Sequence, residues 1–329
     1  MNNSFDLTIC TVSFNSKPWL DLNFELTSSL NPHTRINWVI AENSSSESVL
    51  KLDNNDSRFT IIPGAEFEEK IYASGSYHHA AGMNKTLTHI GSRYVLFLDP
   101  DFFIIKNNWA NEIIDHMQTN RLAILGVPWH PKWYLKNRYF PCVHCMFVDL
   151  ERIPVATLDF SPDYETVPGY KDNEKVQGVI RKSGRLLLKI FDPLKFRKRK
   201  YIGTSRDVSW RIYAQYLDKP SYKIECLQPV FRLQQSRIQY GLEMLLPDRL
   251  SFVPKQKGYF AEKGFREAGL TDLDSLGWEE FIWRDQPFGF HVRSQPKVTS
   301  KESMDFHYTR LVELLHLLHS QNQAMLSSR

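Results

Sequence analysis

Short apolar runs alternate with helical patterns along residues 7–98 of the chain. Runs rich in branched and aromatic residues, which are typical of buried strands, occur at 7–14, 36–40, 59–62 and 92–98. Between them, apolar residues recur at helical spacing in segments 18–30 and 77–90. This alternation predicts an α/β fold with a mostly parallel central sheet flanked by helices.

The alternation continues less regularly beyond residue 100. Helical spacing is present at 109–119, 173–183 and 207–217, and strand-like runs are present at 122–127, 142–150 and 185–191. From about residue 220 the pattern weakens into short helical pieces, an aromatic extended stretch at 283–294 and an amphipathic helix at 305–318. We therefore expect a domain over 1–219. A mainly helical extension over 220–329 is expected to pack on this domain.

The stretch from Ser92 to Ile105 combines the most apolar strand with a pair of carboxylates. Pro100 cannot donate a hydrogen bond to a neighbouring strand, so regular pairing is expected to stop there. Asp99 and Asp101 are two residues apart and therefore point the same way on an extended segment. Their hard oxygen ligands suit Mg²⁺ or Mn²⁺ shared with the phosphates of a ligand. A solvated Asp-Pro-Asp turn is the alternative, but ligands in α/β sheets bind beyond the carboxyl ends of strands.

Composition limits the classes of protein that fit. Of the 329 residues, 42% are hydrophobic and 24% are charged, which is sufficient for a full globular core. A net charge of +4 does not indicate a nucleic-acid partner. The start MNNSFDLTIC is unlike a signal peptide, and no apolar run approaches the roughly 18 residues of a membrane helix. We expect a soluble, cytoplasmic protein with its four cysteines reduced.

Three further motifs have competing interpretations. Cys142 and Cys145 enclose His144 in a zinc-like spacing, but the pair lies in an apolar strand and lacks a second such pair, so we reject a zinc site. The basic run at 195–200 has two interpretations: it forms a solvated loop, or it contacts phosphates or an anionic membrane surface. The aromatic segment at 129–140 either binds a ligand ring by stacking or belongs to the core. The chain contains neither a GxGxxG nor a P-loop motif.

Several segments in sequence order resemble motifs of the GT-A-fold glycosyltransferases, and most closely glycosyltransferase family 2. They are TICTVSFNS, WVIAENSSSES, HHAAGMNKTL, YVLFLDPDFFI with its D-x-D motif, and SRDVSWRIY. The likeness covers about residues 5 to 217. It implies a Rossmann-like GT-A fold, with a nucleotide-sugar half over about 1–105 and an acceptor half over 106–219.

The resemblance assigns donor-binding roles to residues of the first half. Thr11, Ser13 and Phe14 would line the pocket for the nucleotide base. Glu42 stands where the family usually has an aspartate that bonds the base, so the base itself stays open. Asn84 and Lys85 would face the donor. The residue before Asn84 is a methionine where the family often has arginine.

The resemblance also implies a metal site and a general base. Asp99 would reach the ribose or the metal, Asp101 would hold the metal, and His291 would complete the metal shell. An imidazole ligand favours Mn²⁺ over Mg²⁺. Asp207 would accept the proton of the acceptor hydroxyl; a plain helix N-cap is the alternative.

The implied function is inverting transfer of a sugar from a nucleoside-diphosphate sugar to a hydroxyl of a glycan or glycolipid acceptor. The usual context of the family is polysaccharide biosynthesis, with contact to the inner face of a membrane as an open alternative. A sugar-phosphate nucleotidyltransferase is a rival, but the loop after the first strand is not rich in glycine and basic residues. A non-catalytic carbohydrate-binding protein is the other rival, and the three aspartates at 99, 101 and 207 argue against it.

Overall fold

The computed structural model describes most of the chain. The described residues are 5–44, 56–65, 75–131, 138–162, 206–232, 237–246, 248, 251, 253–292 and 307–316. The helix expected at 173–183, the strand expected at 185–191 and the basic run at 195–200 lie outside the described residues.

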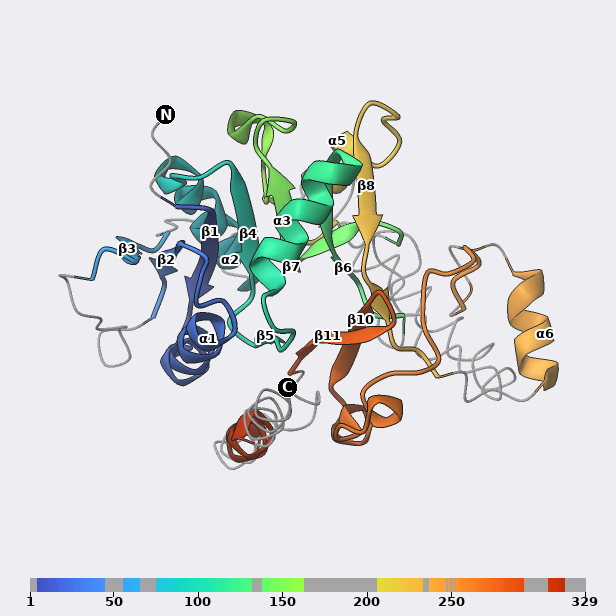
Figure 1. Ribbon diagram of the computed structural model, residues 1–329. Helices are drawn as coiled ribbons and strands as arrows, with labels where there is room; N and C mark the ends of the chain where they lie inside the picture. Colours follow the sequence, from blue (N-terminus) through green and yellow to red (C-terminus); the bar gives the residue numbers. More distant parts are fainter. Residues whose placement is uncertain are drawn as a thin grey trace, which may run out of the picture.

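A central sheet of seven strands organises the described part of the molecule, in the order β3-β2-β1-β4-β7-β6-β8 (Figure 1). Its strands are β1 (Leu7–Ser13), β2 (Ile36–Glu42), β3 (Phe59–Pro63), β4 (Tyr94–Leu98), β6 (Leu122–Pro128), β7 (Pro141–Asp149) and β8 (Lys223–Cys226). The strands β3, β2, β1 and β4 are mutually parallel, whereas β7 runs antiparallel to both β4 and β6. The predicted α/β fold with a mostly parallel central sheet is therefore confirmed.

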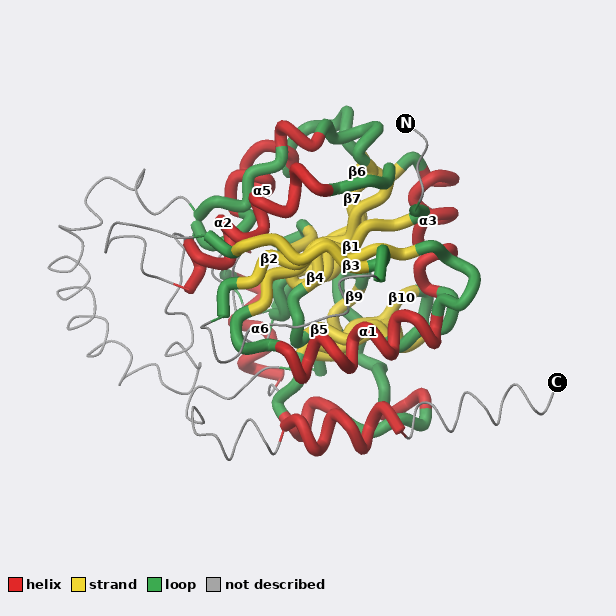
Figure 2. Tube along the Cα trace, turned by 90° about the vertical axis from the view of Figure 1, so that its left-hand side faces the viewer, coloured by secondary structure: helices red, strands yellow, loops and turns green. Residues whose placement is uncertain are grey.

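Helices cover both faces of this sheet (Figure 2). They are α1 (Lys17–Leu30), α2 (Gly75–Thr86), α3 (Trp109–Asn120) and α5 (Trp210–Tyr216). Apolar residues of α1 and α3 pack with Ile9 and Leu96 on one face, and those of α2 and α5 pack with Cys10 and Phe97 on the other. Adjacent strand residues thus serve opposite cores, which explains why the strands are continuously apolar.

A second sheet of four strands, in the order β5-β11-β10-β9, lies beside the central sheet. It is formed by β5 (Phe102–Ile104), β9 (Gln228–Pro229), β10 (Glu279–Trp283) and β11 (Gln286–His291). Further elements are α6 (Arg237–Leu245), the 3₁₀ turns Leu87–His89, Val155–Thr157, Arg266–Ala268 and Leu273–Leu276, and a helix at residues 307–316. The described residues after 220 thus contain the strands β8 to β11 in addition to their helical segments. The rings of Trp283 in β10 and Phe288 in β11 lie 6.2 Å apart, a contact between strands that helical periodicity does not detect.

The helix at residues 307–316 packs against this second sheet and against α1. Leu311 and Leu314 are buried in a cluster with Phe103 and Phe290. The ring of Tyr308 lies 5.9 Å from that of Trp19 in α1.

Two pairs of strands connect the chain segments on either side of the expected boundary at 219/220. After that boundary in sequence, β8 pairs with β6 of the central sheet. Before it, β5 pairs with β11 of the second sheet. The polypeptide therefore passes from one sheet to the other directly after β4, which is where the two carboxylates lie.

Candidate active site

The carboxyl ends of β2, β1 and β4 meet at one edge of the central sheet. Ser13 at the end of β1 is in register with Glu42 at the end of β2. On its other side β1 pairs with β4, whose last residue is Leu98. Asp99, which directly follows β4, therefore lies beside the carboxyl end of β1.

The turn after β4 is held by hydrogen bonds to three neighbouring segments. The backbone N–H of Asp99 donates to the carbonyl of His144 at 3.0 Å. The side chain of Asn23 in α1 donates to the carbonyl of Pro100 at 2.8 Å. The N–H of Val292 donates to the carbonyl of Asp101 at 2.9 Å. Because both sheets and α1 hold it, this turn is fixed and not a freely solvated loop.

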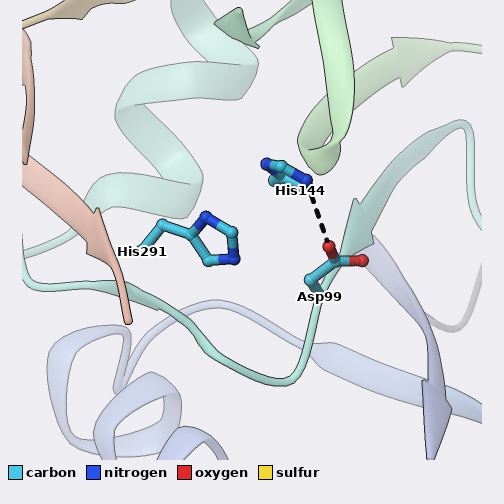
Figure 3. Close-up of side chains that lie close together, drawn as sticks. All are labelled: Asp99, His144 and His291. Carbon is cyan, nitrogen blue, oxygen red and sulfur yellow. Dashed lines mark ion pairs between the residues drawn. The ribbon is translucent and has the colours of Figure 1, made fainter. Parts of the chain in front are cut away.

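Asp99 is surrounded by imidazoles. Its Oδ1 lies 3.2 Å from Nε2 of His79 in α2, and its Oδ2 lies 3.6 Å from Nε2 of His144 in β7. One ligand atom from each of Asp99, His144 and His291 lies within 4.8 Å of the others. Figure 3 shows these three side chains converging from separate elements of the fold.

His291 lies between two carboxylates. Its Nδ1 is 2.9 Å from Oε2 of Glu279, the residue opposite it across β10 and β11. Its Nε2 is 3.2 Å from Oδ1 of Asp101. Asp101 and His291, which the sequence analysis assigns to one metal shell, are therefore in contact, and Glu279 contacts the same imidazole.

The charges of this site shift the pKa values of its members. Burial lowers the pKa of His291, but Asp101 and Glu279 outweigh burial and raise it to about 10. Burial raises the pKa of Asp99, but the charges of His79, His144 and His291 outweigh it and hold the pKa well below the usual range. Both shifts favour the charged forms, the imidazolium of His291 and the carboxylate of Asp99.

Asp207 precedes α5 and is not its N-cap. The helix begins at Trp210, and the cap residue is Ser209, whose side chain makes no capping bond. Oδ1 of Asp207 instead accepts the N–H of Val208 at 2.9 Å. Burial lowers the pKa of His79, but Asp99, Asp101 and Asp207 together raise it above its ordinary value. Asp207 is therefore within electrostatic range of His79, on the α2 side of the site.

The residues predicted to bind the nucleotide base lie at the same edge. The hydroxyls of Thr11 and Ser13 are buried and have no hydrogen-bond partner among the described residues. The side chain of Phe14 is 66% exposed. Oε1 of Glu42 accepts the N–H of Ser44 at 2.8 Å. Buried hydroxyls without partners are costly, so these two positions are candidates for contact with a ligand.

Asn84 and Lys85 make contacts within the protein. The amide of Asn84 donates to Asp159 and Ser161, both at 3.2 Å, and accepts the N–H of Phe160 at 2.9 Å. The ammonium of Lys85 donates to the carbonyl of Gly64 at 2.5 Å. Asn84 thus fixes residues 159–161, and Lys85 fixes the end of β3.

Sequence reasoning did not select His79, His144 or Glu279. The available signal for His144 was its position between two cysteines in an apolar strand, a spacing that was considered for zinc and rejected. Cys142 and Cys145 are buried in the core of the sheet, where burial raises the pKa of each thiol well above its usual value. Neither thiol belongs to the histidine–aspartate cluster.

The donor set fits a divalent transition-metal ion. It combines the carboxylate of Asp99 with the imidazoles of His144 and His291, and such mixed nitrogen and oxygen ligands suit Mn²⁺ and its neighbours. The contact from Nδ1 of His291 to a buried carboxylate is the arrangement that orients a metal-binding imidazole. Asp101, whose side chain is 42% exposed, borders the cluster from the solvent side.

The sequence matches no family model and no curated protein. Solved structures similar to part of the chain include the mannosyltransferase PcManGT from Pyrobaculum calidifontis in complex with GDP-Man and Mn²⁺. It is 12% identical, with 49% of this chain and 50% of that chain covered and a TM-score of 0.33. S. aureus TarS 1–349 is 13% identical, with 47% and 50% covered and a TM-score of 0.36. Galactosyltransferase LgtC in complex with donor and acceptor sugar analogs is 12% identical, with 44% and 58% covered and a TM-score of 0.32.

The matched part spans only about half the length of each of these proteins. Because the likeness is partial, the function proposed for this chain has to rest on its own site. Within the described residues, no helix is both long enough and apolar enough to cross a membrane.

Proposed function

We propose that this protein is an inverting, metal-dependent glycosyltransferase. It transfers a sugar from a nucleoside-diphosphate sugar to a hydroxyl of a glycan or glycolipid acceptor. The observation that carries the proposal is the cluster of Asp99, Asp101, His144 and His291 at the carboxyl edge of the parallel strands. This is the edge where α/β sheets bind nucleotides, and the buried hydroxyls of Thr11 and Ser13 lie on it.

Each side of the reaction has residues suited to it. The bond from the anomeric carbon to the diphosphate breaks, and negative charge develops on the leaving oxygen. A cation held at Asp99 and Asp101, when bound, supplies the positive charge that stabilises this oxygen. Asp207 accepts the proton of the acceptor hydroxyl as that oxygen forms the new bond to the anomeric carbon. Attack opposite the leaving group inverts the configuration.

A panel of nucleotides tests the proposal directly. Melting temperatures are measured with UDP, GDP, dTDP and CMP compounds, with and without Mn²⁺. A compound that binds only the folded state raises the melting temperature, so we expect a Mn²⁺-dependent rise with one of the nucleoside diphosphates. The responding nucleotide also identifies the donor class, and the release of its diphosphate is then followed with the matching nucleotide sugars. No rise with any compound would contradict the proposal.

Asp101→Ala provides the matched variant for this panel. We expect it to lose the Mn²⁺-dependent rise, because a partly exposed carboxylate next to His291 has been removed. Asp115→Ala removes an exposed carboxylate of α3 and serves as the control. A full nucleotide response in the Asp101 variant would remove that residue from the metal site.

A further inference from the structure

His144 occupies a position that the strand direction of β7 creates. Since β7 is antiparallel to β4, its beginning lies where β4 ends, and the carbonyl of His144 accepts the N–H of Asp99 at 3.0 Å. The side chain is 8% exposed, and its Nε2 lies 3.6 Å from Oδ2 of Asp99. Its ring is held between Trp129 at 4.4 Å and His291 at 4.3 Å, measured between ring centroids. The imidazole is therefore fixed with one nitrogen toward the aspartate.

We propose that Asp99, His144 and His291 together bind one divalent cation, with Glu279 as the residue that positions His291. The three ligand atoms lie within 4.8 Å of one another. Ligand atoms on one ion, with bonds of about 2.1 Å, lie roughly 3 to 4 Å apart, so small side-chain rotations bring all three onto a cation.

Glu279 determines which nitrogen of His291 faces the cation. Its side chain is 1% exposed, and Oε2 lies 2.9 Å from Nδ1 of His291. An ionised carboxylate only accepts hydrogen bonds, so Glu279 keeps a proton on Nδ1, and the ion binds at Nε2 in place of the proton that faces Asp101. Nε2 is also the atom that lies 3.2 Å from Asp101. In the same way, His79 lies 3.2 Å from Oδ1 of Asp99, which leaves Oδ2 toward His144.

This ligand set has two consequences for the cation. Two imidazoles and a carboxylate favour Mn²⁺ and Co²⁺ over Mg²⁺, which prefers oxygen ligands and its own waters. Three ligands from the protein also hold the ion without a nucleotide, in contrast to a site of one or two carboxylates that needs phosphates to complete it. The use of this ion in sugar transfer rests on the proposed function, whereas its binding does not.

Titration calorimetry of the full chain with MnCl₂, CoCl₂ and MgCl₂, all without nucleotide, tests the proposal. We expect binding of one Mn²⁺ or Co²⁺ per chain, at least about 10-fold tighter than Mg²⁺. The visible spectrum of bound Co²⁺ is recorded in parallel because it responds to nitrogen ligands.

His144→Phe keeps a ring between Trp129 and His291 but removes the ligand nitrogen. We expect at least about a 10-fold loss of Mn²⁺ affinity and an altered Co²⁺ spectrum. His116→Phe is the matched control, since His116 pairs with Glu225 at 3.0 Å and lies outside the cluster. The positioning role is tested with Glu279→Gln. Its control is Glu280→Gln, because Glu280 is the adjacent buried carboxylate and accepts the N–H groups of Phe265 and Leu273 instead.

The outcomes separate this inference from the proposed function. Equal affinity for Mg²⁺ and Mn²⁺ would contradict a ligand set of two imidazoles and a carboxylate. Unchanged Mn²⁺ affinity in His144→Phe would remove His144 from the ligands. Equal effects of the two glutamate substitutions would remove the positioning role of Glu279. A Mn²⁺-dependent nucleotide response that survives in His144→Phe would overturn the ligand set and leave the transferase intact. Tight Mn²⁺ binding without any nucleotide response would support the cation centre and contradict the transferase.

Discussion

Asp99 and Asp101 are separated by one proline, yet their surroundings differ sharply. The side chain of Asp99 is 14% exposed and lies among imidazoles, whereas that of Asp101 is 42% exposed and contacts His291. Burial with compensating charges keeps Asp99 ionised, and the exposed Asp101 remains accessible to a ligand. Within the proposed metal site, Asp99 thus faces the buried imidazoles, and Asp101 faces solvent and His291.

Replacement of Asp207, the proposed general base, should separate proton transfer from donor binding. We expect Asp207→Asn to lower the rate of sugar transfer by about 10² to 10⁴, because the amide cannot accept the proton of the acceptor. Donor affinity should remain nearly unchanged. Steady-state kinetics together with donor titration check this, and Asp218→Asn at the other end of α5 is the control. Unchanged turnover would exclude Asp207 from the mechanism.

Among the elements, β7 has the largest effect on the site. It inserts antiparallel between β4 and β6, and the direction of this strand brings His144 to the end of β4. At the other end of the same pair, Asp149 is fully buried and accepts two hydrogen bonds from Arg93, at 2.9 and 2.8 Å. Arg152 lies 3.3 Å from the same carboxylate.

Removing Arg93 should destabilise the fold through β7. Arg93→Met leaves the buried carboxylate of Asp149 with less compensation, so we expect a loss of about 3 kcal/mol in the free energy of unfolding. Arg35→Met, which breaks an exposed pair with Asp6, should cost about 0 to 1 kcal/mol. Urea denaturation measures both variants. Similar losses in the two would show that the Arg93 pair does not support the sheet.

The helix at residues 307–316 contributes to stability through its apolar face. Leu311 is 0% exposed in the cluster with Phe290, so Leu311→Ala should cost about 2 to 5 kcal/mol. Leu245→Ala in α6 removes the same atoms from a side chain that is 82% exposed, and a change within about 0.5 kcal/mol is expected. Thermal unfolding distinguishes the two. A small effect at Leu311 would mean that this helix is not part of the cooperative core.

In the whole molecule, the site joins the two sheets. Asp99 and His144 belong to the central sheet, whereas His291 and Glu279 belong to the second. A cation bound between the two sheets should therefore stabilise both sheets against unfolding. Mn²⁺ at about 100 times its dissociation constant should add about 2.7 kcal/mol to the free energy of unfolding, and a chelator should reverse it.

The same measurement on His291→Ala is the control for this effect. The variant should unfold at the same midpoint with and without Mn²⁺, because the ligand from the second sheet is missing. An equal gain in the variant and in the original protein would place the stabilising ion elsewhere.

The sequence by itself determined the strands of the parallel half, the helices between them and the position of the Asp99–Pro100–Asp101 turn. Apolar periodicity and turn residues are local properties, and these elements are short enough for local properties to specify them. The helix expected at 207–217 was found only as Trp210–Tyr216, because Asp207 forms a turn with Val208 before it.

Only the tertiary structure decided which side chains meet. The direction of β7, the pairing of β5 with β11 and the contact of Glu279 with His291 each join residues distant in the chain. The periodicity of the sequence does not predict such contacts. Contacts between residues far apart in the chain are stabilised by burial in the whole fold and not by neighbours in the sequence. His79, His144 and Glu279 therefore entered the site only when the two sheets came together around Asp99.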